Sequence, residues 1–256
     1  PFILHLRTHG THKFNRGLVL VVEGAMPGAA MLSARAALSG GAGYVMLASQ
    51  DRGHAGPDAL VQRVAASAEA LASLLGDDRI GAVVIGPGLG RDDRAKALLD
   101  AVLASPHPLV LDGDALTLLG DTIGSRLSGR AAPSVLTPHG GEFARLFPDP
   151  QGSKIAATCA AAVGTGSIVV HKGGDSVIAH SDGEARILAG SSSWLSTAGT
   201  GDVLAGLIGA RLAVDGAGHA AGQGVWLHGR AAQLAGPAFH ADDLIAHLPG
   251  AIGECL

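Results

Sequence analysis

Aromatic and charged side chains are scarce in this chain of 256 residues, and these shortages exclude several classes of protein. The chain holds 5 Phe, 2 Trp and 1 Tyr, and 16% of its residues are charged against 47% that are hydrophobic. A disordered chain is rich in charge and poor in apolar residues, so the composition predicts a folded protein. Its core must be built mainly from small aliphatic side chains.

Cysteine, long apolar runs and charge of one sign are scarce as well. The 22 acidic and 18 basic residues give a net charge of -4 without a basic stripe, so we expect no nucleic-acid partner. Two cysteines, Cys159 and Cys255, are too few for a disulfide framework and favour a reducing, cytoplasmic location. Because no run of 18 apolar residues is present, we expect no membrane-spanning helix and no membrane partner.

Short runs of β-branched residues alternate with stretches rich in Ala and Leu. Strands are predicted at 18–22, 44–48, 80–85, 109–111, 134–136 and 168–171, with a hairpin at 176–179 and 185–188. Helices are predicted at 29–38, 58–75, 92–104, 142–147, 154–163, 202–214 and 218–234. This alternation indicates an α/β fold with a mostly parallel sheet, helices on both faces and an antiparallel edge hairpin. We expect one domain over residues 1–256, with residues 1–12 as a poorly ordered or extended segment.

Four predicted strands end in polar or Gly-rich loops. These loops cover residues 86–90, 112–114, 137–142 and 171–175. Ligands of parallel sheets bind beyond the carboxyl ends of the strands, so the four loops predict one crevice.

Each loop also has a plain structural interpretation. Residues 86–90 match neither the dinucleotide fingerprint nor the P-loop, and they fit a tight turn equally well. Asp112 and Asp114 would face one side of an extended chain and could hold a metal or a polar substrate, or Asp114 could cap a helix. Lys172 can reach a phosphate, although the two glycines after it could simply form a turn. His139 is a candidate because it lies at a strand end.

The segment around Gly199, Thr200 and Gly201 directly precedes a predicted helix. Small residues let backbone N–H groups approach an anion, and the helix N-terminus adds partial positive charge. Asp202 lies in the first turn, where it is a candidate catalytic group or a carboxylate that only complements the helix dipole.

Other candidates are weaker. His5, His9 and His12 have helical spacing, but they lack the acidic or Cys partners of a closed zinc site. Trp226 and His228 are expected on the face of a packed helix.

Five motifs and one earlier segment resemble those of one known family, in the same order along the chain. The segment 198–202, Ala-Gly-Thr-Gly-Asp, resembles the anion-hole and catalytic-Asp signature of the ribokinase-like superfamily. The segments 27–43, 86–90, 112–116, 137–142 and 172–177 are similar to those of ADP-dependent NAD(P)H-hydrate dehydratases, the C-terminal domain of YjeF-type proteins. The resemblance covers roughly residues 13–234 and implies a three-layer α/β/α sandwich.

The resemblance implies a hydro-lyase that repairs hydrated nicotinamide nucleotides. Such an enzyme dehydrates the S epimer of NADH hydrate or NADPH hydrate and restores NAD(P)H with release of AMP and phosphate. ADP, or ATP, is then the co-substrate and Mg²⁺ the cofactor. Family members commonly form homotetramers, and a separate or fused NAD(P)H-hydrate epimerase is an expected partner.

The resemblance also implies roles for individual residues. Asp202 is the expected catalytic base, and Glu142 is expected to arrange Mg²⁺ through water. The expected hydrate-binding residues are Ala42, Gly88, Gly90, Asp112, Asp114, His139 and Asp202. The expected nucleotide-binding residues are Lys172, Gly173, Gly174, Asp175, Ser176, Gly199, Thr200 and Gly201.

The sequence departs from the family pattern at a few positions. Glu23 stands where Gly is usual after the first strand, Gly113 replaces Ala, Ser176 replaces Thr, and His171 stands where an apolar residue is frequent. Two alternatives remain open at this point. One is a vitamin or sugar kinase of the same superfamily, and the other is an adenine-nucleotide-binding module without catalytic activity.

Overall fold

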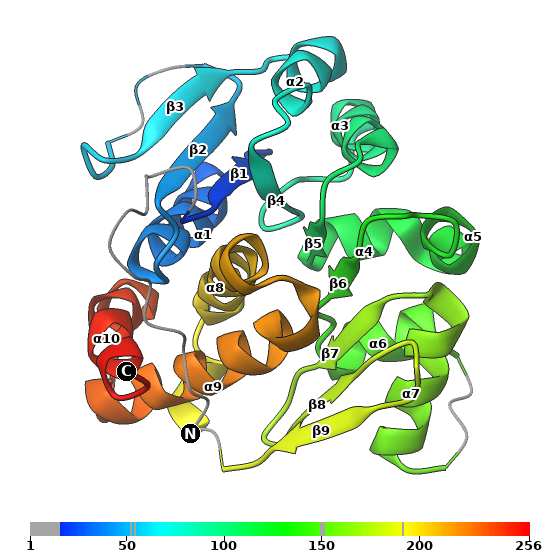
Figure 1. Cartoon of the computed structure of the whole chain (residues 1–256), viewed down its shortest axis with the longest axis vertical. Helices are drawn as coiled ribbons and strands as arrows, with labels where there is room; N and C mark the ends of the chain where they lie inside the picture. Colours follow the sequence, from blue (N-terminus) through cyan, green and yellow to red (C-terminus); the bar gives the residue numbers. More distant parts are fainter. Residues whose placement is uncertain (1–15, 52, 54, 149–151, 191) are drawn as a thin grey trace.

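The computed structural model describes residues 16–51, 53, 55–148, 152–190 and 192–256. Within these residues the strands form one nine-stranded sheet in the order β3-β2-β1-β4-β5-β6-β7-β8-β9 (Figure 1). The strands are β1 Leu18–Val22, β2 Tyr44–Ser49, β3 Val61–Val64, β4 Ile80–Ile85, β5 Leu109–Leu111, β6 Ser134–Leu136, β7 Ile168–His171, β8 Ser176–Ala179 and β9 Ala185–Leu188. Strands β1 to β7 pair in parallel, whereas β8 and β9 add an antiparallel edge. The predicted α/β fold with an edge hairpin is confirmed.

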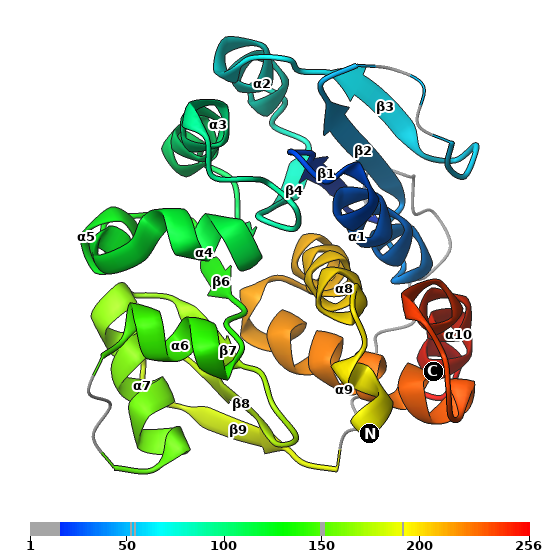
Figure 2. The same cartoon turned by 180° about the vertical axis from the view of Figure 1, so that it is seen from behind.

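Helices cover both faces of this sheet (Figures 1 and 2). The helices are α1 Pro27–Ser39, α2 Ala68–Leu75, α3 Asp93–Ala104, α4 Gly113–Leu119, α5 Ile123–Leu127, α6 Gly140–Leu146, α7 Lys154–Thr165, α8 Thr200–Asp215, α9 Ala217–Ala235 and α10 Ala241–Gly253. Two short 3₁₀ turns occur at Gly120–Thr122 and Ser193–Ser196. Helices α2 to α7 pack on one face, and α1, α8 and α9 pack on the other, with α10 outside them. No helix in the described part of the chain is long and apolar enough to cross a membrane.

The predicted helix at 58–75 is wrong in its first half. Residues Val61–Val64 form β3, which pairs in parallel with β2 at the edge of the sheet. The helix begins only after Ser67, whose side chain accepts a hydrogen bond from the amide of Ala70. The apolar residues at helical spacing therefore belong to two elements. Backbone pairing with β2 and the Ser67 cap decide the boundary.

Two further expectations about local structure need correction. Asp112 and Asp114 do not share one extended stretch, because Asp112 is the extended N-cap of α4 whereas Asp114 lies in the first turn of that helix. Helix α10 was not predicted, since Pro249 and Gly250 inside it look like helix breakers. The N-terminal segment 1–12 and the histidines at positions 5, 9 and 12 lie outside the described residues.

The parallel strands place four loops at one edge of the sheet. The carboxyl ends of β4, β5, β6 and β7 lead into the loops at 86–90, 112–114, 137–142 and 171–175. Helix α8 packs against α1 so closely that a Cβ atom at Gly206 would lie 2.0 Å from the carbonyl oxygen of Ser33. This packing fixes the start of α8 relative to the sheet.

Candidate functional site

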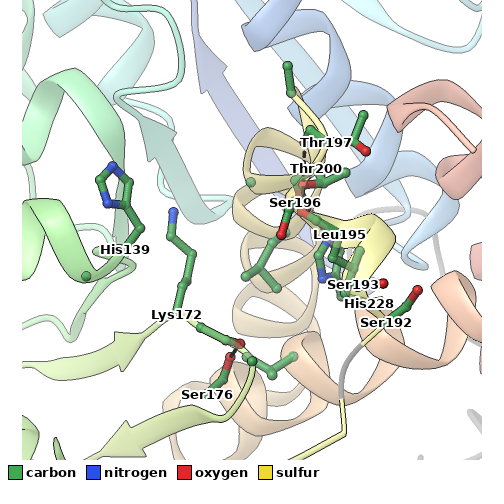
Figure 3. A pocket seen from close by; sticks show the side chains of 17 residues that line it. His139, Lys172, Ser176, Ser192, Ser193, Leu195, Ser196, Thr197, Thr200 and His228 are labelled. Atoms are coloured by element: carbon green, nitrogen blue, oxygen red, sulfur yellow. Dashed lines mark hydrogen bonds between the residues drawn. The ribbon is translucent and has the colours of Figure 1, made fainter.

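A cavity of about 720 Å³ opens where the sheet edge meets the start of α8 (Figure 3). In Figure 3, Lys172 points into it between His139 and Thr200. Its lining residues are His139, Gly140, Lys172, Gly173, Gly174, Ser176, Ser192, Ser193, Leu195, Ser196, Thr197, Ala198, Thr200, Gly201, Leu204, Val225 and His228. The loops after β6 and β7 and the segment before α8 thus meet at this cavity, whereas the predicted loops at 86–90 and 112–114 do not line it.

The first turn of α8 is held rigidly. Gly199 adopts a left-handed conformation with φ of 87°, where a side chain would be strained and would contact Leu32. The hydroxyl of Thr200 donates to the carbonyl oxygens of Leu195, at 2.7 Å, and Thr197, at 2.8 Å. These bonds orient the amides at the helix N-terminus, where an anion is stabilised.

His228 of α9 supports the same turn from inside the protein. Its Nε2 lies 2.9 Å from the carbonyl oxygen of Thr200. Burial lowers the pKa of His228 to about 4, so the neutral ring donates its Nε2–H to that carbonyl. The sequence placed His228 on a packed helix face, but its position against the cavity was not predicted, because helical spacing alone does not show which residue of α9 reaches α8.

An ion pair lies beside the N-terminus of α8. The ammonium of Lys172 is 2.8 Å from Oδ1 of Asp112, whose side chain is 5% exposed. A Cβ atom at Gly201 would lie 3.6 Å from Lys172 Nζ and 3.9 Å from Asp112 Oδ2. The pair therefore joins the ends of β5 and β7 to the start of α8.

Asp202, in the first turn of α8, has a carboxyl pKa near neutrality. Burial and, to a smaller extent, the negative charge of Asp112 raise the pKa of its carboxyl to about 7, while Lys172 opposes the shift. Its carbonyl oxygen accepts a hydrogen bond of 2.8 Å from the hydroxyl of Ser33. A carboxyl group that titrates near pH 7 is suited to general-base catalysis.

His139 and Glu142 form a capping box at the start of α6. Nδ1 of His139 accepts from the amides of Gly141 and Glu142, at 3.0 and 3.3 Å. Oε2 of Glu142 accepts from the amide of His139 at 2.8 Å. Nε2 of His139 lies 3.6 Å from Oε2 of Glu142, and Glu142 is largely buried.

The loop at 86–90 is held by Asp114. Its Oδ2 accepts from the amide of Gly90 at 3.0 Å, and its Oδ1 accepts from Nε of Arg91 at 2.7 Å. A Cβ atom at Gly88 would lie 2.6 Å from the carbonyl oxygen of Met26, so this turn packs directly on the segment before α1. Glu23 follows β1 at the same edge of the sheet, and its side chain is buried.

The structure brings only part of the predicted residues to the cavity wall. His139, Lys172, Gly173, Gly174, Ser176, Thr200 and Gly201 line it. Asp112 contacts Lys172 behind the wall, while Asp175, Gly199 and Asp202 adjoin lining residues in the chain. Ala42 precedes β2 and therefore lies at the opposite end of the sheet from Asp112, so the structure does not bring it to this cavity.

The side chains of the site determine which kind of metal ion it could bind. The described residues contain no group of three or more His, Cys, Asp or Glu side chains that could hold a metal. Mg²⁺ commonly keeps several waters and is bound by one or two carboxylates together with substrate phosphates. Glu142 fits that kind of site, whereas a metal site made by the protein alone does not fit.

Comparison with known proteins points to one enzyme family. The family model described as NAD(P)H-hydrate dehydratase matches residues 19–250. The bifunctional NAD(P)H-hydrate repair enzyme Nnr of Gloeobacter violaceus is 42% identical over 220 residues, which cover 79% of this chain and 42% of that protein. The chain thus spans less than half the length of this relative.

Solved structures support the same assignment. The ADP/ATP-dependent NAD(P)H-hydrate dehydratase of Bacillus subtilis, co-crystallised with ATP and Mg²⁺, is 26% identical with a TM-score of 0.85, over 99% of this chain and 95% of that chain. A ribokinase-like superfamily protein of Enterococcus faecalis is 27% identical with a TM-score of 0.85, over 99% and 92% of the two chains. From its sequence, its ribokinase-like fold and the ordered loops of its site, the chain belongs to the NAD(P)H-hydrate dehydratase family.

Proposed function

We propose that this chain dehydrates the S epimer of NADH hydrate or NADPH hydrate with ADP as co-substrate. The observation that carries the proposal is Asp202, which lies in the first turn of α8 with a pKa of about 7 beside the Asp112–Lys172 pair. One carboxyl group is thus poised to accept a proton next to a helix N-terminus that stabilises phosphate.

The cavity supports binding of an adenine nucleotide. Its volume of about 720 Å³ falls within the range of roughly 300–1,000 Å³ that is usual for small-molecule sites. Lys172 supplies a positive charge, and Gly173, Gly174 and Gly201 expose backbone at the cavity wall. We propose that these groups and the hydroxyls of Ser176 and Thr200 receive the phosphates and ribose, with Asp175 and Gly199 shaping the two loops.

In the proposed reaction, Asp202 accepts the proton of the hydrate hydroxyl. The hydroxyl oxygen then attacks the terminal phosphoryl group of ADP, and AMP leaves. The N-terminal amides of α8 and Lys172 stabilise the negative charge that develops on the phosphoryl oxygens. The nitrogen of the nicotinamide ring next expels inorganic phosphate, and loss of a proton from the neighbouring ring carbon restores NAD(P)H.

Mg²⁺ fits this scheme as a companion of the nucleotide. We propose that Glu142 orients it through water, because the capping box fixes its carboxylate next to His139, which lines the cavity. When bound, the ion supplies charge neutralisation at the phosphates.

The hydrate side of the site is proposed to lie along the loops after β4, β5 and β6. His139 reaches the cavity directly. Gly88 and Gly90 offer backbone groups, and Asp112 holds Lys172. Since both carboxylate oxygens of Asp114 accept hydrogen bonds from residues 90 and 91, we propose that Asp114 acts on the hydrate through this loop. Ala42 stays a prediction from the family resemblance.

Incubation with chemically prepared NADPH hydrate and ADP or ATP tests the proposed function. We expect NADPH absorbance to return together with one inorganic phosphate per NADPH. Appearance of a stable phosphorylated product instead would support a small-molecule kinase. Nucleotide binding without any turnover would support a module that has lost catalytic activity.

Assembly and location are also proposals. We propose a homotetramer in the cytoplasm, working with a separate or fused NAD(P)H-hydrate epimerase. Two free cysteines, Cys159 and Cys255, support a reducing compartment. The bifunctional names of relatives that are about twice as long as this chain support an epimerase partner.

A further inference from the structure

Lys154, the first residue of α7, is placed where a cation is not expected for helix stability. The N-terminus of a helix carries partial positive charge, so an ammonium group in the first turn is unfavourable there. Helix α7 is capped by Ser153 without any acidic residue in its first turn. A reason for this lysine must therefore lie outside the helix.

The side chain of Lys154 leaves α7 and reaches the loop at 172–175. Its ammonium donates to the backbone carbonyl of Asp175 and, at 3.5 Å, to that of Lys172. These two carbonyls bracket Gly173 and Gly174, which line the cavity. The ammonium thus closes the loop on the side away from the cavity.

Gly173 leaves the space that the ammonium occupies. A Cβ atom at this position would lie 2.8 Å from Lys154 Nζ. Burial lowers the pKa of the Lys154 ammonium, and the Asp175 carboxylate opposes that shift, which agrees with a partly enclosed group. Lys154 can therefore take this position only because residue 173 has no side chain.

The bonds to Lys154 also set the direction of a backbone donor. The peptide between Lys172 and Gly173 is trans, as no described peptide bond is cis. The N–H of Gly173 then points opposite to the Lys172 carbonyl, away from Lys154. That N–H has no backbone acceptor among the described residues. Since Gly173 lines the cavity, this N–H is available to an anion bound there.

We propose that Lys154 is a positioning residue that holds the loop at 172–175 in the shape that receives the phosphates of the nucleotide. The inference rests on the proposed binding of ADP in this cavity. It requires that loss of the ammonium weakens binding of the phosphates and leaves binding of the nucleoside and of the hydrate unchanged.

The test compares Lys154→Met, Lys154→Arg and the control Lys96→Met, whose lysine lies on α3 and pairs with Asp93. Calorimetry with ADP and with adenosine is combined with KM values for ADP and for NADPH hydrate. For Lys154→Met we expect the Kd and KM for ADP to rise about ten-fold, the scale of a lost hydrogen bond to a charged group. Adenosine affinity and the KM for hydrate should not change, Lys154→Arg should recover most of the loss, and Lys96→Met should behave as the parent.

The outcomes separate this inference from the proposed function. A parent protein that neither binds ADP nor turns over NADPH hydrate would contradict both the proposed function and the role of Lys154. A parent that binds ADP while Lys154→Met binds it equally well would overturn only the role of Lys154. Equal losses of ADP and adenosine affinity would also overturn it, because they would indicate a general collapse of the cavity.

A second variant tests the same contact without removing the charge. Gly173→Ala places a methyl group 2.8 Å from the ammonium, which is too close, so we expect it to displace Lys154 and weaken ADP binding selectively. In the double variant with Lys154→Met, the alanine should reduce ADP affinity only slightly further, because the ammonium that it would displace is already absent. Fully additive losses in this double-mutant cycle would contradict the coupling.

Discussion

The carboxyl group of Asp202 owes its protonation behaviour to three features of its surroundings. Burial disfavours the ionised form, the neighbouring carboxylate of Asp112 does the same, and Lys172 favours it, with the pKa raised to about 7 as the result. His228, packed under the same turn, is neutral because burial lowers its pKa to about 4. Activity that needs an ionised Asp202 must therefore depend on pH close to neutrality.

We expect kcat/KM for the hydrate to rise with pH through an apparent pKa of about 7, because the base must be ionised to accept a proton. In Asp112→Asn the like charge is lost and Lys172 is released, so the rise should move to lower pH. Initial rates between pH 5 and 9 with saturating ADP, with Asp93→Asn as control, measure this shift. An unchanged midpoint in Asp112→Asn would show that Asp112 does not tune the base.

The raised pKa of Asp202 also makes the free energy of unfolding depend on pH. Between the ordinary value of 3.8 and about 7 the folded protein binds a proton at Asp202 that the unfolded chain has lost, so this group lowers the free energy of unfolding as pH rises. In Asp202→Asn the side chain does not titrate, so this decrease in the free energy of unfolding is absent. We expect the melting temperature of the variant relative to the parent to increase from pH 4 to pH 8. A constant difference across this range would contradict the buried, raised carboxyl.

Packing between helices decides how firmly the first turn of α8 is placed. Helices α1 and α8 meet through small residues, and Gly206 allows the backbone of α8 to lie directly on Ser33. The hydroxyl of Ser33 in turn donates to the carbonyl of Asp202. The close packing of α1 on α8 therefore also holds the end of α8 that carries Asp202.

Gly206→Ala tests this packing against a matched glycine of α9. The added methyl group would lie 2.0 Å from a backbone oxygen, so we expect the free energy of unfolding to fall by about 1–3 kcal/mol or more. Gly229 has nothing within 4 Å of such a methyl group, and Gly229→Ala should stabilise α9 by roughly 0.5–1 kcal/mol. Urea unfolding of both variants compares the two. Equal effects would contradict the close approach.

Helices and strands with a clear spacing of apolar residues and with Gly or polar residues at their ends could be predicted from the sequence. Elements whose type depends on pairing with another strand could not. The buried strands from β4 to β7 and the loops after them were predicted because short apolar runs end in Gly or polar residues. Strand β3 was not, since Val61 and Val64 also fit the helical spacing of the segment that follows. The Asp112–Lys172 pair, 60 residues apart, is visible only once β5 and β7 are ordered in the sheet.

At the scale of the whole molecule, the cavity joins parts that are distant in sequence. His139 follows β6, Lys172 follows β7, and Thr200 and His228 come from α8 and α9. His139 contributes an imidazole, Lys172 a cation and Thr200 a helix N-terminus, and His228 supports that terminus from behind. We propose that these parts act as one functional unit within a single domain.

The proposed tetramer is a prediction at this scale. The prediction comes from the family resemblance, and the exposed side chains of Ile187, at 53%, and Trp194, at 45%, are candidates for burial between chains. Light scattering at micromolar concentration should give a mass of four chains. A mass of one chain would contradict the assembly without affecting the proposed chemistry.

The role of Asp202 is the central claim, and Asp202→Asn tests it most directly. The amide keeps the shape of the carboxylate but cannot accept the hydroxyl proton. We predict that turnover of NADPH hydrate falls by about 10²- to 10⁴-fold, while ADP affinity stays within about threefold of the parent and Asp93→Asn, a first-turn aspartate of α3, retains full activity. A folded Asp202→Asn protein that binds ADP and turns over within about threefold of the parent would contradict the account.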